Sequence, residues 1–421
     1  MKTTKALLTL LLLSAIPQIA SAQTYAIRDV NIVTGSGETI PNGNILIQDG
    51  RIAAIGEDIS IPRRTETIDG RGLTAYPGMI DPHTSIGLRE ISSVAATLDT
   101  NEIGDLNPHM MASGAISPHS EHIPVARVNG ITTVMSAPGG GLFAGQGAII
   151  NLNGWVTDEM LVDDGAAMII NFPGELNFDA DTSQQRRSRR EDARQEEIDL
   201  LRKTLAEAQA FAKLIDAGVD DPGNFIQRAL VPVVRGEMSA IFTVDTATEV
   251  REALEIAEEF GLKTILSGCT QAWSAVDLIK SKNASVILGP ITDLPENDED
   301  PYDSVFTLPA KLAAAGVKFA LSTRDSAHVR DLPFLAGMAA AFGLSKEEAL
   351  RAVTISPAEI LGVSDQIGSL AEGKVANIML AEGDPLEVMT NLRHLFIAGK
   401  PVDLTSKHTD LWEKFSKRPD N

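Results

Sequence analysis

The sequence has one cysteine, few aromatic residues and a shortage of basic residues, and each shortage excludes a class of protein. Cys269 alone can form neither an intrachain disulfide nor a cysteine-cluster metal site, so the 421-residue chain must be stabilised by its core. Aromatic residues make up only 5% of the chain, which predicts a core of Ala, Leu, Ile and Val. The 36 Lys and Arg against 57 Asp and Glu give a formal net charge of −21, which repels phosphate backbones and anionic membranes. We therefore expect no nucleic-acid partner.

The first 22 residues have the pattern of a secretory signal peptide. Lys2 and Lys5 precede an apolar run over residues 6–19, and residues 20–22 read Ala-Ser-Ala, which is typical of a cleavage site. The run is short for a membrane-spanning helix of about 20 residues, so cleavage after Ala22 is favoured over an uncleaved anchor. We expect an exported protein, periplasmic or extracellular, without a membrane span after cleavage.

The order of predicted strands and helices indicates an α/β fold. Residues 24–72 contain short strands, two of them on either side of an Asp49-Gly50 turn. Strand-like runs then alternate with helical patterns, which is typical of a parallel sheet or a (β/α)8 barrel. We predict a (β/α)8 TIM-like barrel over residues 73–365 and a small β-sandwich built from residues 23–72 and 366–405. A C-terminal tail follows at 406–421.

Residues 186–217 form a long, highly charged stretch with a helical pattern. Arginines cluster at its start, but mixed charge is more typical of a solvated helix face than of a binding site. We expect this helix to decorate the barrel.

Three segments together carry a resemblance to a known family. Residues 75–85 contain Pro77-Gly78-Met79-Ile80-Asp81-Pro82-His83, residues 344–362 contain Thr354-Ile355-Ser356-Pro357-Ala358, and residues 367–377 run from Ile367 to Asn377. The chain resembles the amidohydrolase superfamily, and within it the imidazolonepropionase-like group, over about residues 25–405. The family pattern usually has Ala-Asp where this chain has Ala376-Asn377.

The resemblance implies a fold, a chemistry and a cofactor. Members of the family hydrolyse amide or related C–N bonds with one or two divalent ions at the C-terminal mouth of the barrel, where barrel active sites lie. The metal lowers the pKa of a bound water and polarises the carbonyl. The resemblance thus implies a zinc-type divalent metal and a small-molecule substrate.

The chain departs from the family at most of its metal-ligand positions. His83 matches the first histidine of the family's His-x-His pair, but Ser85 stands at the second position. Other ligand positions also carry different residues, namely Thr243, Ser267–Cys269 and Asn171. Asp325 matches the aspartate after the eighth strand. The resemblance therefore implies His83 and Asp325 as metal ligands, although a catalytic zinc usually has three protein ligands.

Further candidate site residues follow from their positions near strand ends. We predict Asp325 as the catalytic residue, and Gln271, His328 and Ser85 as substrate-binding residues. Asp325 also has the sequence context of an N-cap or loop carboxylate, and His83 could line the mouth without binding a metal.

A histidine-containing loop offers a second route to a site. His119 and His122, with Glu121, could rebuild a metal site if their loop folded over the mouth. Their spacing matches no known metal motif, so a solvent-facing polar loop is the favoured interpretation.

The sequence leads to one function hypothesis with two alternatives. The first is an exported amidohydrolase-like hydrolase that acts on C–N bonds other than peptide bonds and has a degenerate metal site. The second is a non-catalytic protein of the same fold that acts as a binding or partner subunit. A hydrolase or isomerase with a metal-free site and Asp325 as base is the third. The sequence leaves a homo- or hetero-oligomer open.

Overall fold

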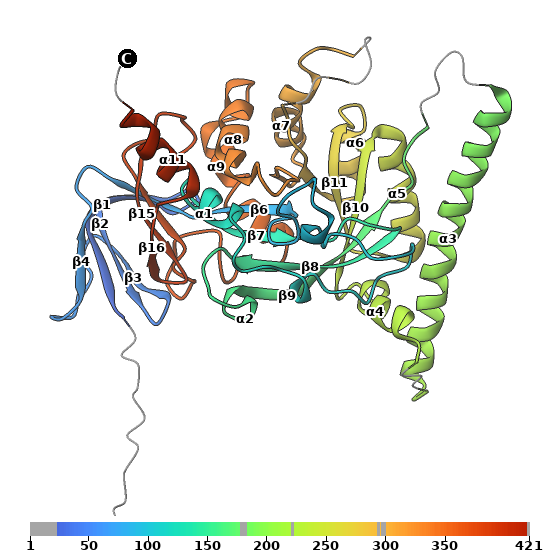
Figure 1. The fold of residues 1–421 in the computed structure, drawn as a ribbon, viewed down its shortest axis with the longest axis horizontal. Coiled ribbons are helices and arrows are strands. Elements are labelled where there is room, and N and C mark those ends of the chain that lie inside the picture. The colour runs from blue at the N-terminus through green and yellow to red at the C-terminus, as the bar shows by residue number, and fades with distance from the viewer. Residues whose placement is uncertain (1–22, 177–182, 220–222, 293–294, 296–299, 419–421) are drawn as a thin grey trace, which may run out of the picture.

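The computed structural model describes residues 23–418 except 177–182, 220–222, 293–294 and 296–299, and its strands form two sheets (Figure 1). The predicted signal peptide, residues 1–22, lies outside the described residues. Among the described residues, no helix combines the length and the apolar character that a membrane crossing requires.

The first sheet, here called the terminal sheet, joins the two ends of the chain. Its strands are β1 (Tyr25–Val33), β2 (Thr39–Gln48), β3 (Arg51–Gly56), β4 (Glu66–Asp69), β5 (Thr74–Pro77), β14 (Ile378–Ala381), β15 (Leu392–Ile397) and β16 (Lys400–Val402). Asp49 and Gly50 both have positive φ in the β2–β3 turn, as a tight hairpin requires. Strand β14 pairs antiparallel with β5, so the sheet extends past the boundary expected at residue 72.

The second sheet is the barrel, and its strands follow one another in chain order. They are β6 (Met79–Thr84), β7 (Ile131–Ser136), β8 (Phe143–Asn151), β9 (Leu161–Asn171), β10 (Ser239–Thr246), β11 (Thr264–Gln271), β12 (Ser285–Leu288) and β13 (Phe319–Leu321). The predicted TIM-like barrel with β-rich terminal segments is confirmed. One detail differs, because β8 runs antiparallel to both of its neighbours. The glycine-rich connection at 137–142 is too short for a crossover helix, so the chain turns back on itself.

The interior of the barrel is filled by apolar side chains from every strand. One large or central residue from each strand is Ile80, Met135, Ile149, Ile169, Ile241, Ile265, Ile287 or Ala320, and β8 and β9 add Ala144 and Ala167. Each is at most 3% exposed, so the barrel is a packed core rather than a channel. Helix α10 (Ile355–Ile360) contributes Ala358 and Ile360 to the same cluster.

Hydrogen bonds from side chains join the two edge strands, β6 and β13. Ser322 Oγ donates to Asp81 Oδ1 at 2.7 Å and to the carbonyl of His83 at 2.8 Å. The hydroxyl and the backbone N–H of Thr323 donate to Asp81 Oδ2 at 2.5 and 3.1 Å. Asp81 is fully buried and therefore acts as the junction at which the sheet closes into a barrel.

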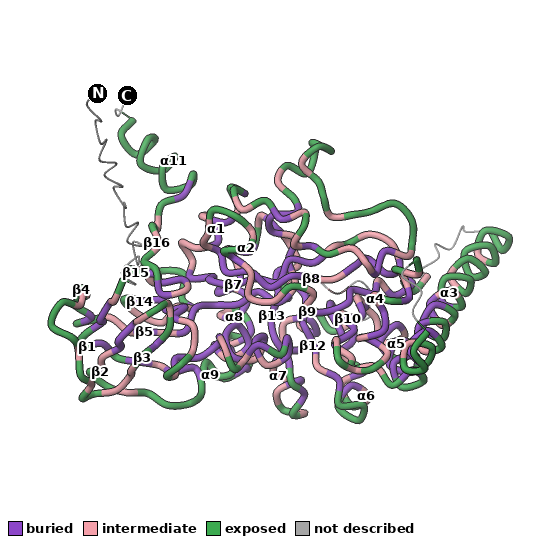
Figure 2. The backbone as a smooth tube through the Cα atoms, turned by 90° about the horizontal axis from the view of Figure 1, so that it is seen from below, coloured by how far each residue is buried: buried purple, intermediate pink, exposed green. Residues whose placement is uncertain are grey.

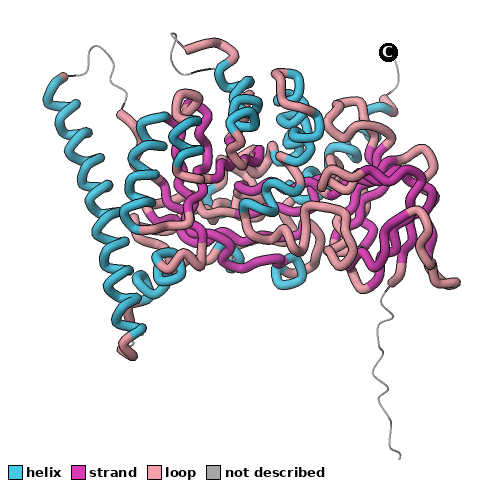
Figure 3. Tube along the Cα trace, turned by 180° about the vertical axis from the view of Figure 1, so that it is seen from behind, coloured by secondary structure: helices cyan, strands magenta, loops and turns pink. Residues whose placement is uncertain are grey.

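Helices surround the barrel on its outer side (Figures 1 and 3). The remaining helices are α1 (His122–Arg127), α2 (Thr157–Met160), α3 (Gln184–Asp216), α4 (Phe225–Val234), α5 (Ala247–Phe260), α6 (Val276–Ser281), α7 (Ser304–Ala315), α8 (Leu332–Ala341), α9 (Lys346–Arg351) and α11 (Lys407–Ser416). The charged stretch near residue 190 forms α3, which packs on α4 and α5 at one end of the molecule. It buries Ile198, Leu201 and Leu205 and leaves its other face exposed (Figure 2).

Candidate functional site at the barrel mouth

A cavity of about 430 Å³ opens where the parallel barrel strands end. Its wall contains residues from the ends of β6, β9 and β10 and from the segments that follow β6, β7 and β13. These residues are His83, Thr84, Ser85, Arg89, Leu98, Thr100, Asn101, Ala137, Pro138, Gly139, Asn171, Thr243 and Arg324. Barrel active sites lie at this end of the strands, so we take the cavity as the candidate site. We call it the mouth cavity.

Among the described residues that line the mouth cavity, His83 is the only histidine. Its Nδ1 lies 2.7 Å from Ser267 Oγ of β11, and Ser267 is fully buried. Burial, and then the positive charge of Arg324, lower the pKa of His83 to about 3. The ring is therefore neutral near pH 7, and one of its nitrogens is already engaged by a hydroxyl.

Arg324 extends across the mouth from the end of β13. It has φ +50, a left-handed conformation that is uncommon for a residue with a side chain. Its Nη1 lies 3.4 Å from Asp245 Oδ1, beyond the ends of β11 and β12. A Cβ built on Gly268 would lie 2.6 Å from Arg324 Nη1, and one built on Gly289 would lie 3.2 Å from Arg324 Cδ. The two glycines thus leave the space that this side chain fills.

Thr243 and Asn171 stand at two of the substituted ligand positions and have different roles. The amide of Asn171 donates to the carbonyls of Gly139 and Gly141, both at 2.8 Å, and anchors the glycine-rich connection after β7. Thr243 Oγ1 is buried and has no hydrogen-bond partner in the described part of the chain. The wall of the mouth cavity therefore includes a residue whose hydroxyl oxygen is buried and has unused hydrogen-bonding capacity.

The carboxylate of Asp325 is held by groups of its own turn. Asp325 Oδ1 accepts hydrogen bonds from the backbone N–H groups of Ser326 and Ala327, and Oδ2 lies 3.1 Å from His328 Nδ1. Burial raises the pKa of Asp325, but the hydrogen bonds, led by that of His328, outweigh it and lower the pKa overall. Asp325 does not line the mouth cavity; its carboxylate holds its own turn, as in the loop-carboxylate interpretation.

The three predicted substrate-binding residues lie in three different settings. Ser85 lines the mouth cavity, and its backbone N–H bonds to the carbonyl of Asp325 at 3.3 Å. His328 is on the surface with its side chain 61% exposed. Gln271 ends β11 with a buried Oε1 that has no described partner, and it lies outside the lining of the mouth cavity. The structure thus places Ser85 and His83 in one cavity and the other two elsewhere.

Comparisons with known proteins agree with this architecture. A sequence profile of the amidohydrolase family matches residues 243–405. The imidazolonepropionase of Syntrophobacter fumaroxidans is 23% identical over 382 residues, which cover 82% of this chain and 84% of that protein. That of Symbiobacterium thermophilum is 24% identical over 389 residues, with 81% and 84% covered.

The chain is similar to members of the amidohydrolase superfamily. The relatives that align over most of its length include imidazolonepropionases. An amidohydrolase from Thermotoga maritima MSB8 has the same fold, with a TM-score of 0.79 and 24% identity over 90% of this chain and 99% of that one. The comparisons support a family that acts on C–N bonds.

The donors at the mouth do not fit the divalent metal that this amidohydrolase family generally uses. A catalytic zinc needs about three protein ligands, but the cavity wall offers one imidazole, and no group of three or more His, Cys, Asp or Glu suited to a metal occurs among the described residues. Arg324 also brings a fixed positive charge to the mouth, which repels a divalent cation. We therefore derive no step through a metal.

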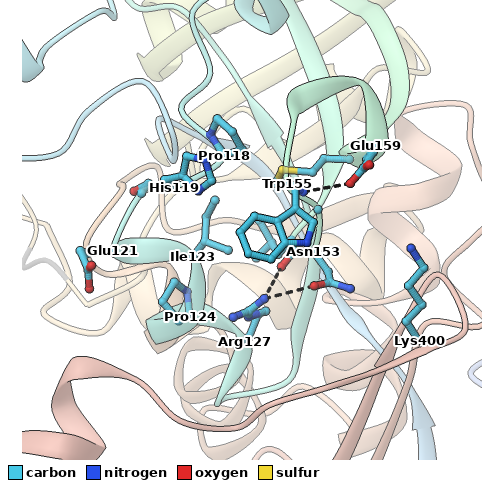
Figure 4. A pocket seen from close by; sticks show the side chains of 14 residues that line it. Pro118, His119, Glu121, Ile123, Pro124, Arg127, Asn153, Trp155, Glu159 and Lys400 are labelled. Carbon is cyan, nitrogen blue, oxygen red and sulfur yellow. Dashed lines mark hydrogen bonds between the residues drawn. The ribbon is translucent and has the colours of Figure 1, made fainter.

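The loop that contains His119 and His122 does not rebuild a site at the mouth. His119 lines a separate pocket on the flank of the barrel, where its ring packs edge-on against Trp155 at 6.3 Å (Figure 4). His122 Nε2 lies 3.0 Å from the carbonyl of Glu90, and the side chain of Glu121 points away from the other labelled side chains of this pocket. His119 and Glu121 are exposed, as in the favoured interpretation of a polar loop, whereas His122 is partly buried and begins α1.

Sequence reasoning missed Arg324 and the hydroxyl of Ser267. From the sequence, Ser267 is only a substitution at a ligand position, and Arg324 has no assigned role. A signal for Arg324 existed, because the ends of β11 and β12 both carry glycine, at 268 and 289. Small residues at neighbouring strand ends indicate that a large side chain crosses them.

Proposed function

We propose that the protein binds a small molecule in the mouth cavity and does so without a divalent metal. The observation that supports this proposal is the wall of the cavity, in which Arg324 and a neutral His83 lie where metal ligands would be required. A volume of about 430 Å³ is within the range of small-molecule sites. The proposal corresponds to a superfamily member that acts as a binding or partner subunit.

Binding is tested by a variant that fills the mouth cavity. Asn101 lies in the wall on an exposed loop, so Asn101→Trp should fold and occupy part of the cavity. We expect small polar amides that raise the melting temperature of the wild type to lose that effect in Asn101→Trp. Arg63→Trp, an exposed substitution outside the cavity wall, is the matched control and should keep the effect. Compounds that stabilise wild type and Asn101→Trp equally would contradict the proposal.

Metal independence is tested by elemental analysis of protein purified without chelator. We expect less than one tenth of an equivalent of zinc, manganese or iron, and no change of melting temperature in EDTA. One equivalent of metal that survives dialysis would overturn this part of the proposal.

A second candidate function is hydrolysis of a C–N bond other than a peptide bond. The contact of 2.7 Å between His83 Nδ1 and Ser267 Oγ favours it, because an imidazole beside a hydroxyl can act as a base. A turnover of cyclic or N-acylated amides that persists in EDTA and disappears in Ser267→Ala would support this candidate. The pKa of His83, near 3, makes it a weak base, and for this reason we place binding first.

Export is a further proposal, carried by the signal-like pattern of residues 1–22. A secreted or periplasmic product whose N-terminus is Gln23 is the expected result. A full-length N-terminus in the cytoplasmic fraction would contradict it.

A further inference from the structure

The wall of the mouth cavity has a charge opposite to that of the whole protein. The chain has 57 Asp and Glu, yet among the described residues that line the cavity none is acidic and two, Arg89 and Arg324, are arginine. Arg89 is exposed at the rim. A positive cavity in an otherwise acidic protein attracts an anion of low charge more effectively than its surroundings do.

The backbone around Arg324 is built to hold this side chain across the mouth. Arg324 and Cys269 both have positive φ, at +50 and +57. Arg324 comes after β13, and Cys269 lies near the end of β11, on the other side of β12. Such conformations cost free energy and tend to occur at functional sites. Together with the space left by Gly268 and Gly289, they indicate a defined position for the guanidinium rather than a mobile surface arginine.

The guanidinium keeps most of its hydrogen-bonding capacity. Arginine has five N–H donors, and the ion pair that Arg324 makes among the described residues is one contact of 3.4 Å from Nη1 to Asp245. The Asp245 side chain is 46% exposed, so solvent weakens this pair. The Arg324 side chain is 23% exposed and is open toward the cavity that it lines.

We propose that the guanidinium of Arg324 provides a fixed positive charge at the barrel mouth and binds the carboxylate group of a small ligand. Its planar set of donors matches a carboxylate in a bidentate geometry. Asp245 contacts the guanidinium at Nη1. The inference rests on the proposed binding function and adds the chemical class of the ligand.

A carboxylate fits better than a phosphate for an electrostatic reason. The protein has a formal net charge of −21, which repels a doubly charged anion more strongly than a singly charged one. Besides the two arginines and a few apolar residues, the cavity wall contains neutral polar side chains such as Asn101, Thr100 and Ser85, which suits a ligand that also carries an amide or hydroxyl group.

The test uses a matched pair of probes with the full mature chain. N-acetylglycine carries a carboxylate, N-acetylglycinamide is its neutral analogue, and inorganic phosphate is the third probe. We expect saturable binding of N-acetylglycine by calorimetry in a non-coordinating buffer, and at least tenfold weaker binding of the other two. Arg324→Met should weaken N-acetylglycine binding at least tenfold. Arg324→Lys should retain an intermediate affinity, because lysine keeps the positive charge but lacks the planar pair of N–H donors.

Two further variants keep the test decisive if Arg324→Met unfolds. Arg89 is exposed, so Arg89→Met should fold and weaken carboxylate binding about threefold to tenfold, whereas Arg251→Met on the exposed face of α5 should have no effect. Equal affinity for N-acetylglycine and its neutral amide, both lost in Asn101→Trp, would overturn the carboxylate assignment and leave the binding function standing. Tighter binding of phosphate, or no saturable binding of N-acetylglycine, would also overturn the assignment.

Discussion

Asp81 shows that a residue from the family motif can serve the fold rather than the site. It is fully buried and accepts hydrogen bonds from Ser322 and Thr323 at the closure of the barrel. Burial raises the pKa of Asp81 to about 6, although these hydrogen bonds lower it in part. The carboxyl group is therefore charged at neutral pH at a cost in stability.

This shift predicts a pH dependence of stability. Between the unfolded pKa of about 4 and the folded pKa of about 6, the folded state binds the proton more tightly, so stability falls as pH rises. Above pH 6 this loss of stability is complete, and it lowers the free energy of unfolding by about 3 kcal/mol. Urea unfolding at pH 4 and pH 7 measures it.

Asp81→Asn is the control, because it cannot ionise. The difference in unfolding free energy between wild type and Asp81→Asn should change by about 3 kcal/mol across this pH range. A difference that stays constant with pH would show that the carboxyl group does not titrate there.

Sequence reasoning located some mouth residues and could not locate others. His83 and Ser85 were found because a motif fixes their strand end, and both line the cavity. Asp325 was found by the same means, but its carboxylate caps a turn. No sequence pattern distinguishes a carboxylate that points into the cavity from one that caps its own turn. The role of Arg324 depends on contacts with Asp245, which lies 79 positions away in the sequence.

At the scale of elements, the N-terminus of α5 connects three parts of the site. Thr246 and Glu249 form a capping box, in which Glu249 Oε2 accepts the N–H groups of Asp245 and Thr246. Glu249 Oε1 also accepts the N–H of Glu175, in the segment after β9. This carboxylate holds the end of β10, from which Asp245 reaches Arg324.

Glu249→Ala should therefore be strongly destabilising. It leaves three backbone N–H groups without their acceptor at a buried position, which predicts a loss of about 2–3 kcal/mol in unfolding free energy. Glu255→Ala on the exposed face of α5 should stay within about 0.5 kcal/mol of wild type. Chemical denaturation of both variants checks the prediction, and equal losses would contradict it.

Helix signals were more informative in the sequence than strand direction. Charge on one face of residues 249–260 and the glycine that follows them are helix signals in the sequence, and α5 ends at Phe260 with Gly261 at φ +66. The reversal of β8 was not predicted. Strand propensity is the same in either direction, and only the short length of the 137–142 connection indicates a turn back.

At the scale of the whole molecule, Asn377 connects the terminal sheet to the barrel. Its amide Nδ2 donates to Thr133 Oγ1 at 3.1 Å and to Asn151 Oδ1 at 2.8 Å, both on barrel strands. Its Oδ1 accepts the N–H of Ala398 in the terminal sheet at 2.8 Å. Asn377 supplies two N–H donors that an aspartate at this position would lack. This explains why the chain departs here from the family's Ala-Asp pattern.

Asn377→Asp should destabilise the protein by about 2–4 kcal/mol, because a buried carboxylate would face two acceptors. Asn31→Asp, on the exposed side of β1, keeps its role as an acceptor and should change stability by less than about 0.5 kcal/mol. Thermal unfolding monitored by circular dichroism compares them. An unchanged melting temperature of Asn377→Asp would show that the amide donors are dispensable.

The pairing of β5 with β14 has a consequence for biogenesis. More than three hundred residues separate Thr74 from its partner Ala381, so a ribosome must release nearly the whole polypeptide before this pairing can form. Until then the nascent chain exposes an unpaired strand edge that favours aggregation. Yield from expression should therefore depend on chaperone supply, and a stop codon shortly before residue 378 should give insoluble product.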